Sequence, residues 1–165
     1  MAARSKDGET PLYWASYRGD VELARLLLEH GANVAAWNKD GETPLHRACE
    51  RGRKELAQLF LKHGGDVAAQ NKDGETPLHR ACNGGRMALA QLLVDRGDDQ
   101  EPKNKDGKTP LYLACETHHV NLVRFLIEYG LRSRSSGPEQ DERGWTPLHV
   151  ASFKGFVRLA RLLVK

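Results

Sequence analysis

The sequence has no long apolar run. No stretch of its 165 residues approaches the roughly 20 apolar residues that a membrane-spanning helix requires, so we expect no membrane anchor. The first residues, Met1 to Ser5, also lack the apolar core of a secretory signal peptide. We therefore expect an intracellular protein, either cytoplasmic or nuclear.

The chain also lacks a large excess of charge of either sign. The 25 Lys and Arg residues nearly balance the 22 Asp and Glu residues, which leaves a net charge of +3. Nucleic-acid-binding domains usually carry a strong basic excess. Binding of nucleic acid through a stripe of arginines is therefore an alternative that the composition disfavours.

Cysteine is rare, with only three residues. Cys49 follows His46 by three positions and Cys82 follows His79 in the same way, a spacing that can supply half of a zinc site. A zinc site needs four converging ligands, however, and these pairs recur with the repeat described next. No nucleophile with a neighbouring base is evident either. We expect no metal, no cofactor and no enzymatic activity.

A repeated motif accounts for most of what is present. Lys-Asp-Gly, then Glu or Lys, then Thr-Pro-Leu recurs with a step of 33 residues, and its aspartates are Asp7, Asp40, Asp73 and Asp106. A fifth copy, from Gly144 to Leu148, comes four residues late, and the extra length falls between Leu131 and Gln140. The period predicts a single domain over 1–165, with units at about 5–37, 38–70, 71–103, 104–140 and 141–165.

Each unit has the pattern of a turn followed by two helices. In the second unit, Thr43 can cap a helix and Pro44 suits its first position. The first helix is predicted over 44–50, before Gly52, and the second from about Arg53. Helices this short are not stable alone and must stack on neighbouring units. The sequence therefore predicts an all-α repeat fold, an α-solenoid.

The repeated residues resemble the ankyrin repeat: Asp-Gly-x-Thr-Pro-Leu-His-x-Ala, a glycine at the helix junction, and Leu-Leu-x-x-Gly at the end of the second helix. The match covers nearly the whole chain. The resemblance implies L-shaped units whose β-turn fingers and first helices form a concave face where partners usually bind. It also implies that His46 and His79 tie adjacent turns together, and that Cys49, Cys82 and Cys115 occupy one small inward position.

Several positions depart from the family pattern. His118 stands where a glycine is expected at the helix junction, so it must either adopt a costly positive φ or reshape that turn. The residues from Leu131 to Pro138 predict a longer loop in place of a tight hairpin. Phosphorylation between Arg132 and Ser136 is an alternative that the composition does not favour. Neither end carries a polar capping unit, so we expect the chain to be part of a longer array.

Large rings, arginines and polar residues that vary between units mark the predicted concave face. Aromatic residues and arginine are favoured anchors in protein interfaces. The predicted protein-binding residues are Trp14, Tyr17, Arg18, Trp37, Arg47, Glu50, Arg51, Arg80, Asn83, Trp145 and Phe153. For Trp14 the alternative is that it fills the core at the edge of the first unit.

Arg47 and Arg80 allow two interpretations. They take a first-helix position that is apolar in later units, and they can form an anion-seeking patch. Alternatively, Glu50, Glu42 and Glu75 can neutralise them within the chain.

The pattern as a whole favours a monomeric scaffold that binds a protein or peptide of acidic or mixed charge on its concave face. A regulatory or substrate-docking module of a larger enzyme or channel is the alternative function. The identity of the partner does not follow from the sequence, because the surface varies on a common frame.

Overall fold

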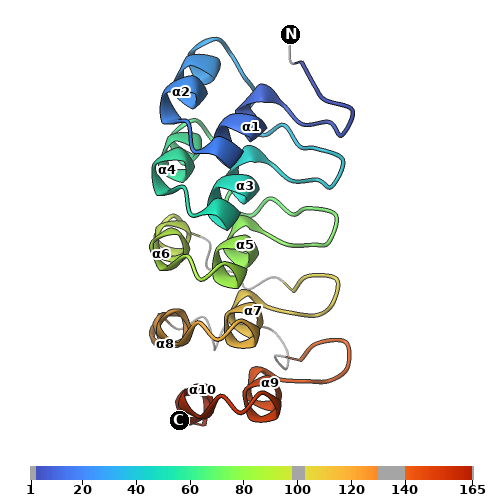
Figure 1. The fold of residues 1–165 in the computed structure, drawn as a ribbon, viewed down its shortest axis with the longest axis vertical. Helices are drawn as coiled ribbons and strands as arrows, with labels where there is room; N and C mark the ends of the chain where they lie inside the picture. Colours follow the sequence, from blue (N-terminus) through green and yellow to red (C-terminus); the bar gives the residue numbers. More distant parts are fainter. Residues whose placement is uncertain (1–2, 98–102, 130–139, 165) are drawn as a thin grey trace.

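The computed structural model describes residues 3–97, 103–129 and 140–164. Within these ranges the chain forms ten helices. Successive helices lie side by side in pairs, and the pairs stack along the long axis of the molecule (Figure 1). The helices are α1 (Pro11–Arg18), α2 (Val21–Glu29), α3 (Pro44–Arg51), α4 (Lys54–Lys62), α5 (Pro77–Asn83), α6 (Met87–Asp95), α7 (Pro110–Glu116), α8 (Val120–Glu128), α9 (Pro147–Phe153) and α10 (Val157–Leu163). The predicted all-α repeat fold is confirmed.

The two helices of each unit lie in separate columns. The odd-numbered helices stack on one another, and the even-numbered helices form a second column beside them (Figure 1). Five loops, which we call fingers, project beyond the first helices at residues 3–10, 36–43, 69–76, 103–109 and 140–146 (Figure 1). No described helix is long and apolar enough to cross a membrane.

A threonine precedes every first helix. Its side-chain oxygen accepts a hydrogen bond from the backbone N–H three residues later, as Thr10 does from Tyr13 and Thr109 from Tyr112. A proline follows at the first helical position. The cap satisfies a backbone donor that the helix start leaves without a partner, and proline has no N–H to satisfy. The Thr-Pro pair of the repeat thus sets where each first helix begins.

His46 ties the second unit to the third. Its Nδ1 accepts a hydrogen bond from the backbone N–H of Thr43 at 3.2 Å, and its Nε2 donates to the carbonyl oxygen of Glu75 at 3.0 Å. Burial lowers the pKa of His46, which favours this neutral form. His79 contacts the carbonyl oxygen of Lys108 in the same way at 3.2 Å. The structural role that the resemblance implied for these histidines is confirmed.

Each finger is held in shape by a side chain and joined to its neighbour by the backbone. Asn38 Oδ1 accepts a hydrogen bond from the backbone N–H of Asp40 at 3.0 Å. The backbone N–H of Lys39 donates to the carbonyl of Asp7 in the preceding finger at 2.7 Å, and Lys72 donates to Asp40 at 2.8 Å. The later steps repeat this bond between Lys105 and Asp73 and between Glu142 and Asp106. The fingers therefore stack in a fixed register.

The apolar core is continuous through the stack. Leu45, Leu56, Phe60, Leu78 and Leu89 are fully buried. Burial of such a side chain contributes about 1.5–3 kcal/mol, whereas helices of this length are marginal on their own. The small positions of the core include Cys49, Cys82 and Cys115, all of them buried.

A side chain from the following unit packs over the helix junction. A Cβ placed on Gly19 would lie 2.7 Å from Arg53 Nε, so this glycine leaves room for the guanidinium. In the fourth unit the same position is His118, which has a φ of 63° and stacks on Phe156 with the ring centroids 3.9 Å apart. Of the two possibilities for His118, the structure shows the positive φ, and the stacked rings take the place of the glycine contact.

The predicted insertion between Leu131 and Gln140 lies outside the described residues, except for Gln140 itself.

Candidate protein-binding face

A polar network links the first helices of the first three units. The Tyr13 hydroxyl donates to Glu42 Oε2 at 2.9 Å, and Arg47 Nη2 lies 3.2 Å from the same oxygen. Arg80 Nη2 lies 2.7 Å from Glu42 Oε1. Arg80 Nε also lies 3.1 Å from Glu75 Oε2, an ion-pair contact without hydrogen-bond geometry. Glu42 thus joins a tyrosine and two arginines from three units.

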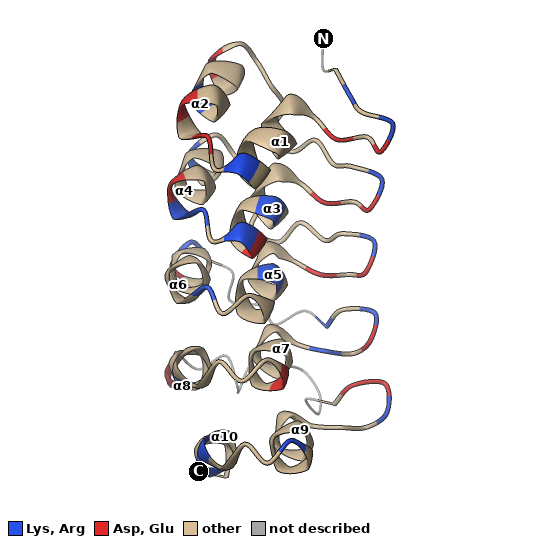
Figure 2. Cartoon of the chain, in the orientation of Figure 1, with Lys and Arg blue, Asp and Glu red and all other residues tan. Residues whose placement is uncertain are grey.

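These contacts decide between the two interpretations of Arg47 and Arg80. Arg47 pairs with Glu50 as well as with Glu42, and the side chains of Arg47 and Arg80 are only 19% and 21% exposed. Internal pairing is what the structure shows, rather than a patch open to anions, because the nearby carboxylates already neutralise both guanidinium groups. Basic and acidic residues also lie side by side within the fingers (Figure 2).

Tyr13 is held as a hydrogen-bond donor. Burial, together with the charge of Glu42, raises the pKa of Tyr13 to about 12, although the hydrogen bond from Arg47 acts in the opposite direction. The hydroxyl therefore stays protonated at neutral pH and can donate to Glu42.

Trp14 and Tyr17 form an exposed aromatic cluster on α1. Their ring centroids lie 5.5 Å apart in an edge-on arrangement, and the two residues are 45% and 40% exposed. The Arg51 guanidinium lies 4.2 Å from the centroid of the Tyr17 ring, a cation–π contact. The exposure of Trp14 agrees with a surface position rather than with its filling the core.

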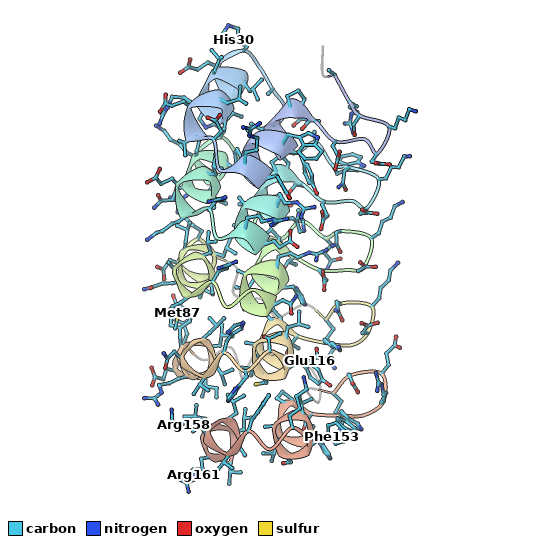
Figure 3. All side chains as sticks on the ribbon, viewed as in Figure 1. His30, Met87, Glu116, Phe153, Arg158 and Arg161 are labelled. Carbon is cyan, nitrogen blue, oxygen red and sulfur yellow. The ribbon has the colours of Figure 1, made fainter. Side chains whose placement is uncertain are left out.

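A second aromatic cluster lies in the fifth unit. The ring centroids of Trp145 and Phe153 are 5.3 Å apart, again edge-on. Phe153 is 77% exposed, whereas Trp145 is half-buried. Figure 3 shows Phe153 on the finger side of α9. Phe153 occupies the repeat position that Tyr17 has in the first unit, so both ends of the described stack present an aromatic ring there.

Trp37 stands at the start of the second finger and is 61% exposed. Its carbonyl oxygen accepts a hydrogen bond from Arg4 Nη1 at 2.7 Å. The residue borders a hollow of about 680 Å³ whose lining includes Val34, Ala69 and Gln70. This hollow gives the second and third fingers a partly apolar recess beside an exposed tryptophan.

The other predicted residues lie on the surface with different neighbours. Arg18, Arg51 and Asn83 are exposed, and Glu50 is partly exposed beside Arg47. Leu113 and Val150, which replace Arg47 and Arg80 in the last two units, are buried. This position is therefore partly buried in the second and third units and buried in the last two, and the two arginines there depend on neighbouring carboxylates for charge balance.

The repeat, the paired helices and the stacked fingers are features of one kind of protein. The chain matches a protein family described as ankyrin repeats (3 copies). The matched residues are 1–71, 54–136 and 88–165. The chain belongs to the ankyrin repeat family. Ankyrin repeats are generally protein–protein interaction modules and are not typically catalytic. No curated protein gives a significant match to the chain.

The described part of this ankyrin repeat array contains no group of three or more His, Cys, Asp or Glu side chains arranged to hold a metal ion. His46 and Cys49 are both fully buried, and both nitrogens of His46 already contact backbone groups. The His–Cys spacing in these ankyrin repeats therefore reflects packing within the stack.

Tyr13 is a member of the network that was not among the residues predicted from the sequence. The repeat contains a signal for it, because Tyr13 occupies the position that His46 has in the next unit. Tyr112 does the same in the fourth unit, and its hydroxyl donates to Asp141 Oδ2 at 2.9 Å. In this ankyrin array a histidine at that position bonds the backbone of the next finger, and a tyrosine, which is longer, bonds a carboxylate there.

Proposed function

We propose that this ankyrin repeat array binds a segment of a partner protein along its first helices and fingers, and that it has no catalytic activity of its own. The observation that carries the proposal is the exposure of four large aromatic residues there: Trp14, Tyr17, Trp37 and Phe153. Exposed aromatic side chains cost free energy in water and are the residues that interfaces favour as anchors.

The spacing of the aromatic residues supports an extended partner. The Trp14–Tyr17 and Trp145–Phe153 clusters are four units apart, and stacked helices are separated by roughly 8–10 Å per step. The clusters are therefore roughly 30–40 Å apart along the stack, a distance that an extended segment of about 10–12 residues spans. One such segment can contact both clusters.

The charges between the two clusters support a partner of mixed rather than strongly acidic character. Arg47 and Arg80 are already paired with Glu42, so a carboxylate of the partner has to compete with an internal one. Glu50 and Glu116 are partly exposed and are each paired with a basic residue of this chain. A partner with apolar anchors and both signs of charge suits this surface best.

The test compares capture of proteins from a lysate of cells that express the chain. One variant removes three anchors, Trp14→Ala, Trp37→Ala and Phe153→Ala. The matched control removes three exposed apolar side chains from the second-helix side, Leu26→Ala, Tyr129→Ala and Val164→Ala. Quantitative mass spectrometry should find a protein that the wild type and the control variant retain and that the anchor variant loses.

Direct measurement then has to reproduce the result with the purified partner. We expect at least a tenfold weaker affinity for the anchor variant, because single interface aromatic residues often contribute about 2 kcal/mol or more. Circular dichroism should show the same helix content in both variants. Equal capture by the anchor variant and the wild type would assign binding to another surface.

A further inference from the structure

A basic groove lies among the second helices, away from the face described above. It has a volume of about 800 Å³ and is bordered by α8 and α10 and by the helix junctions of the third and fourth units. Figure 3 shows Arg158 and Arg161 at the outer edge of α10, on the opposite side of the stack from Phe153. The groove is therefore separate from the first-helix face.

Three arginines line this groove: Arg124 from α8, and Arg158 and Arg161 from α10. All three are exposed, and none of their side chains forms an ion pair or hydrogen bond with another described residue. No acidic residue is among the lining residues of the described chain. Glu128, the nearest carboxylate along α8, borders an adjoining smaller hollow together with Arg124. The groove thus concentrates positive charge that the described residues do not neutralise.

The two arginines of α10 occur together in the fifth unit alone of the five. The position of Arg158 is occupied by Glu22, Glu55, Ala88 and Asn121 in the first four units. The position of Arg161 is occupied by Arg25, Gln58, Gln91 and Arg124. At the Arg158 position, glutamate in the first two units therefore gives way to neutral residues and then to arginine. The repeat fold does not require this change, since the same backbone accepts glutamate in units one and two.

Apolar side chains form the rest of the groove. Met87, Val120, Leu122 and Leu162 contribute to its lining. A free inorganic anion gains nothing from such a surface, whereas a peptide that alternates acidic and apolar side chains gains from both kinds of contact. The groove extends over two helix steps, roughly 16–20 Å, which about five or six extended residues span.

We propose that this groove binds a short acidic segment of a partner protein that also carries leucine-like side chains. The carboxylates pair with Arg124, Arg158 and Arg161, and the apolar side chains lie against Met87 and Leu162. This surface is independent of the first-helix face, so the chain can hold two segments at once.

The probe is a fluorescein-labelled peptide, Glu-Leu-Asp-Glu-Leu-Asp, titrated with the full chain and followed by fluorescence anisotropy. We expect binding that weakens as salt is raised, because the ion pairs form near the surface. The variant Arg158→Glu with Arg161→Glu should weaken binding by at least about tenfold, since it replaces two attractions by two repulsions. A peptide with Gln and Asn at the acidic positions should bind at least about tenfold more weakly.

The matched control is Arg25→Glu with Lys54→Glu, which changes the net charge by the same amount on α2 and α4. It should leave the affinity within about twofold of the wild type. An equal loss in both double variants, or no binding by the wild type, would overturn the proposal. Equally tight, arginine-dependent binding of a labelled single-stranded oligonucleotide would also overturn it, since the groove would then be a general polyanion site. Removal of Trp14 and Phe153 should not change this binding, so the two proposals fail separately.

Discussion

The carboxylate of Glu42 reaches Arg80, a side chain of the next unit, with 2.7 Å between Oε1 and Nη2. The Glu42 side chain is only 8% exposed, and it also contacts Tyr13 and Arg47. A single carboxylate in the second finger therefore pairs with arginines of two units and accepts a hydrogen bond from a tyrosine of a third.

Replacement Glu42→Gln should destabilise the fold by about 1–3 kcal/mol, because it removes the charge that compensates two largely covered guanidinium groups. Urea unfolding followed by circular dichroism measures the change. Glu55→Gln, an exposed carboxylate in the same unit, is the control and should stay within about 0.5 kcal/mol of the wild type. Equal stability of the two variants would show that the network contributes nothing to the fold.

His46 should make stability depend on pH below neutrality. Burial lowers the pKa of His46 in the folded state, while the unfolded side chain titrates near about 6.5. Below that pH the unfolded state binds a proton that the folded state does not. The contribution of His46 to the free energy of unfolding is therefore fully present above about pH 6.5. It falls as the pH is lowered toward the pKa of the folded state, by at most about 1.4 kcal/mol per pH unit.

Chemical denaturation between pH 8 and pH 5 measures that slope, and His46→Gln should reduce it. The glutamine variant will be less stable at pH 8, since it loses the bond to the Glu75 carbonyl oxygen. The comparison of slopes, rather than of absolute stabilities, tests the protonation argument. An unchanged slope in the variant would assign the pH dependence to other groups.

Alanine variants of Gly31 and Gly41 distinguish the cost of backbone strain from the cost of a clash between two fingers. Both have a positive φ, 77° and 80°, but a Cβ on Gly41 would lie 3.0 Å from the backbone nitrogen of Lys72, whereas a Cβ on Gly31 would meet nothing within 4 Å. Gly31→Ala should cost about 1 kcal/mol for the left-handed conformation alone. Gly41→Ala should cost at least about 1 kcal/mol more, because the third finger has to move. Thermal unfolding of the two variants measures the difference.

His118 should tolerate glycine better than a β-branched residue. Glycine relieves the positive φ of 63° but loses the stack on Phe156, two effects of about 1 kcal/mol that nearly cancel. Valine both loses the ring and strains the backbone, so His118→Val should cost about 2 kcal/mol or more. If glycine proved as harmful as valine in thermal unfolding, stacking would be the dominant contribution at this junction.

The period and the Thr-Pro starts made most of the fold predictable. α3 begins at the predicted Pro44, and α4 begins one residue after the predicted Arg53. These features depend on residues close together in the sequence, namely a cap, a proline and a terminating glycine. The same holds for His46, whose role follows from its place in the motif.

The charge pattern of the two surfaces was less predictable. Glu42 and Arg80 are 38 positions apart, and nothing local to either one specifies that their side chains meet. The sequence therefore left internal pairing and an open anion patch as alternatives. The groove at Arg158 did have a signal, since aligned units show glutamate giving way to arginine, but its shape depends on how α8 and α10 are spaced.

The bond between successive fingers has an evolutionary consequence. The donor at Lys72 recurs at Lys105, and the acceptor at Asp40 recurs at Asp73, so each unit meets its neighbours through the same pair of backbone groups. Loss of one whole 33-residue unit by recombination would join surfaces that already fit, and the array could change length without redesign of its interfaces. Such an event would break contacts between individual side chains, such as that from Glu42 to Arg80. Side-chain pairs of this kind therefore indicate which units have stayed adjacent in the array.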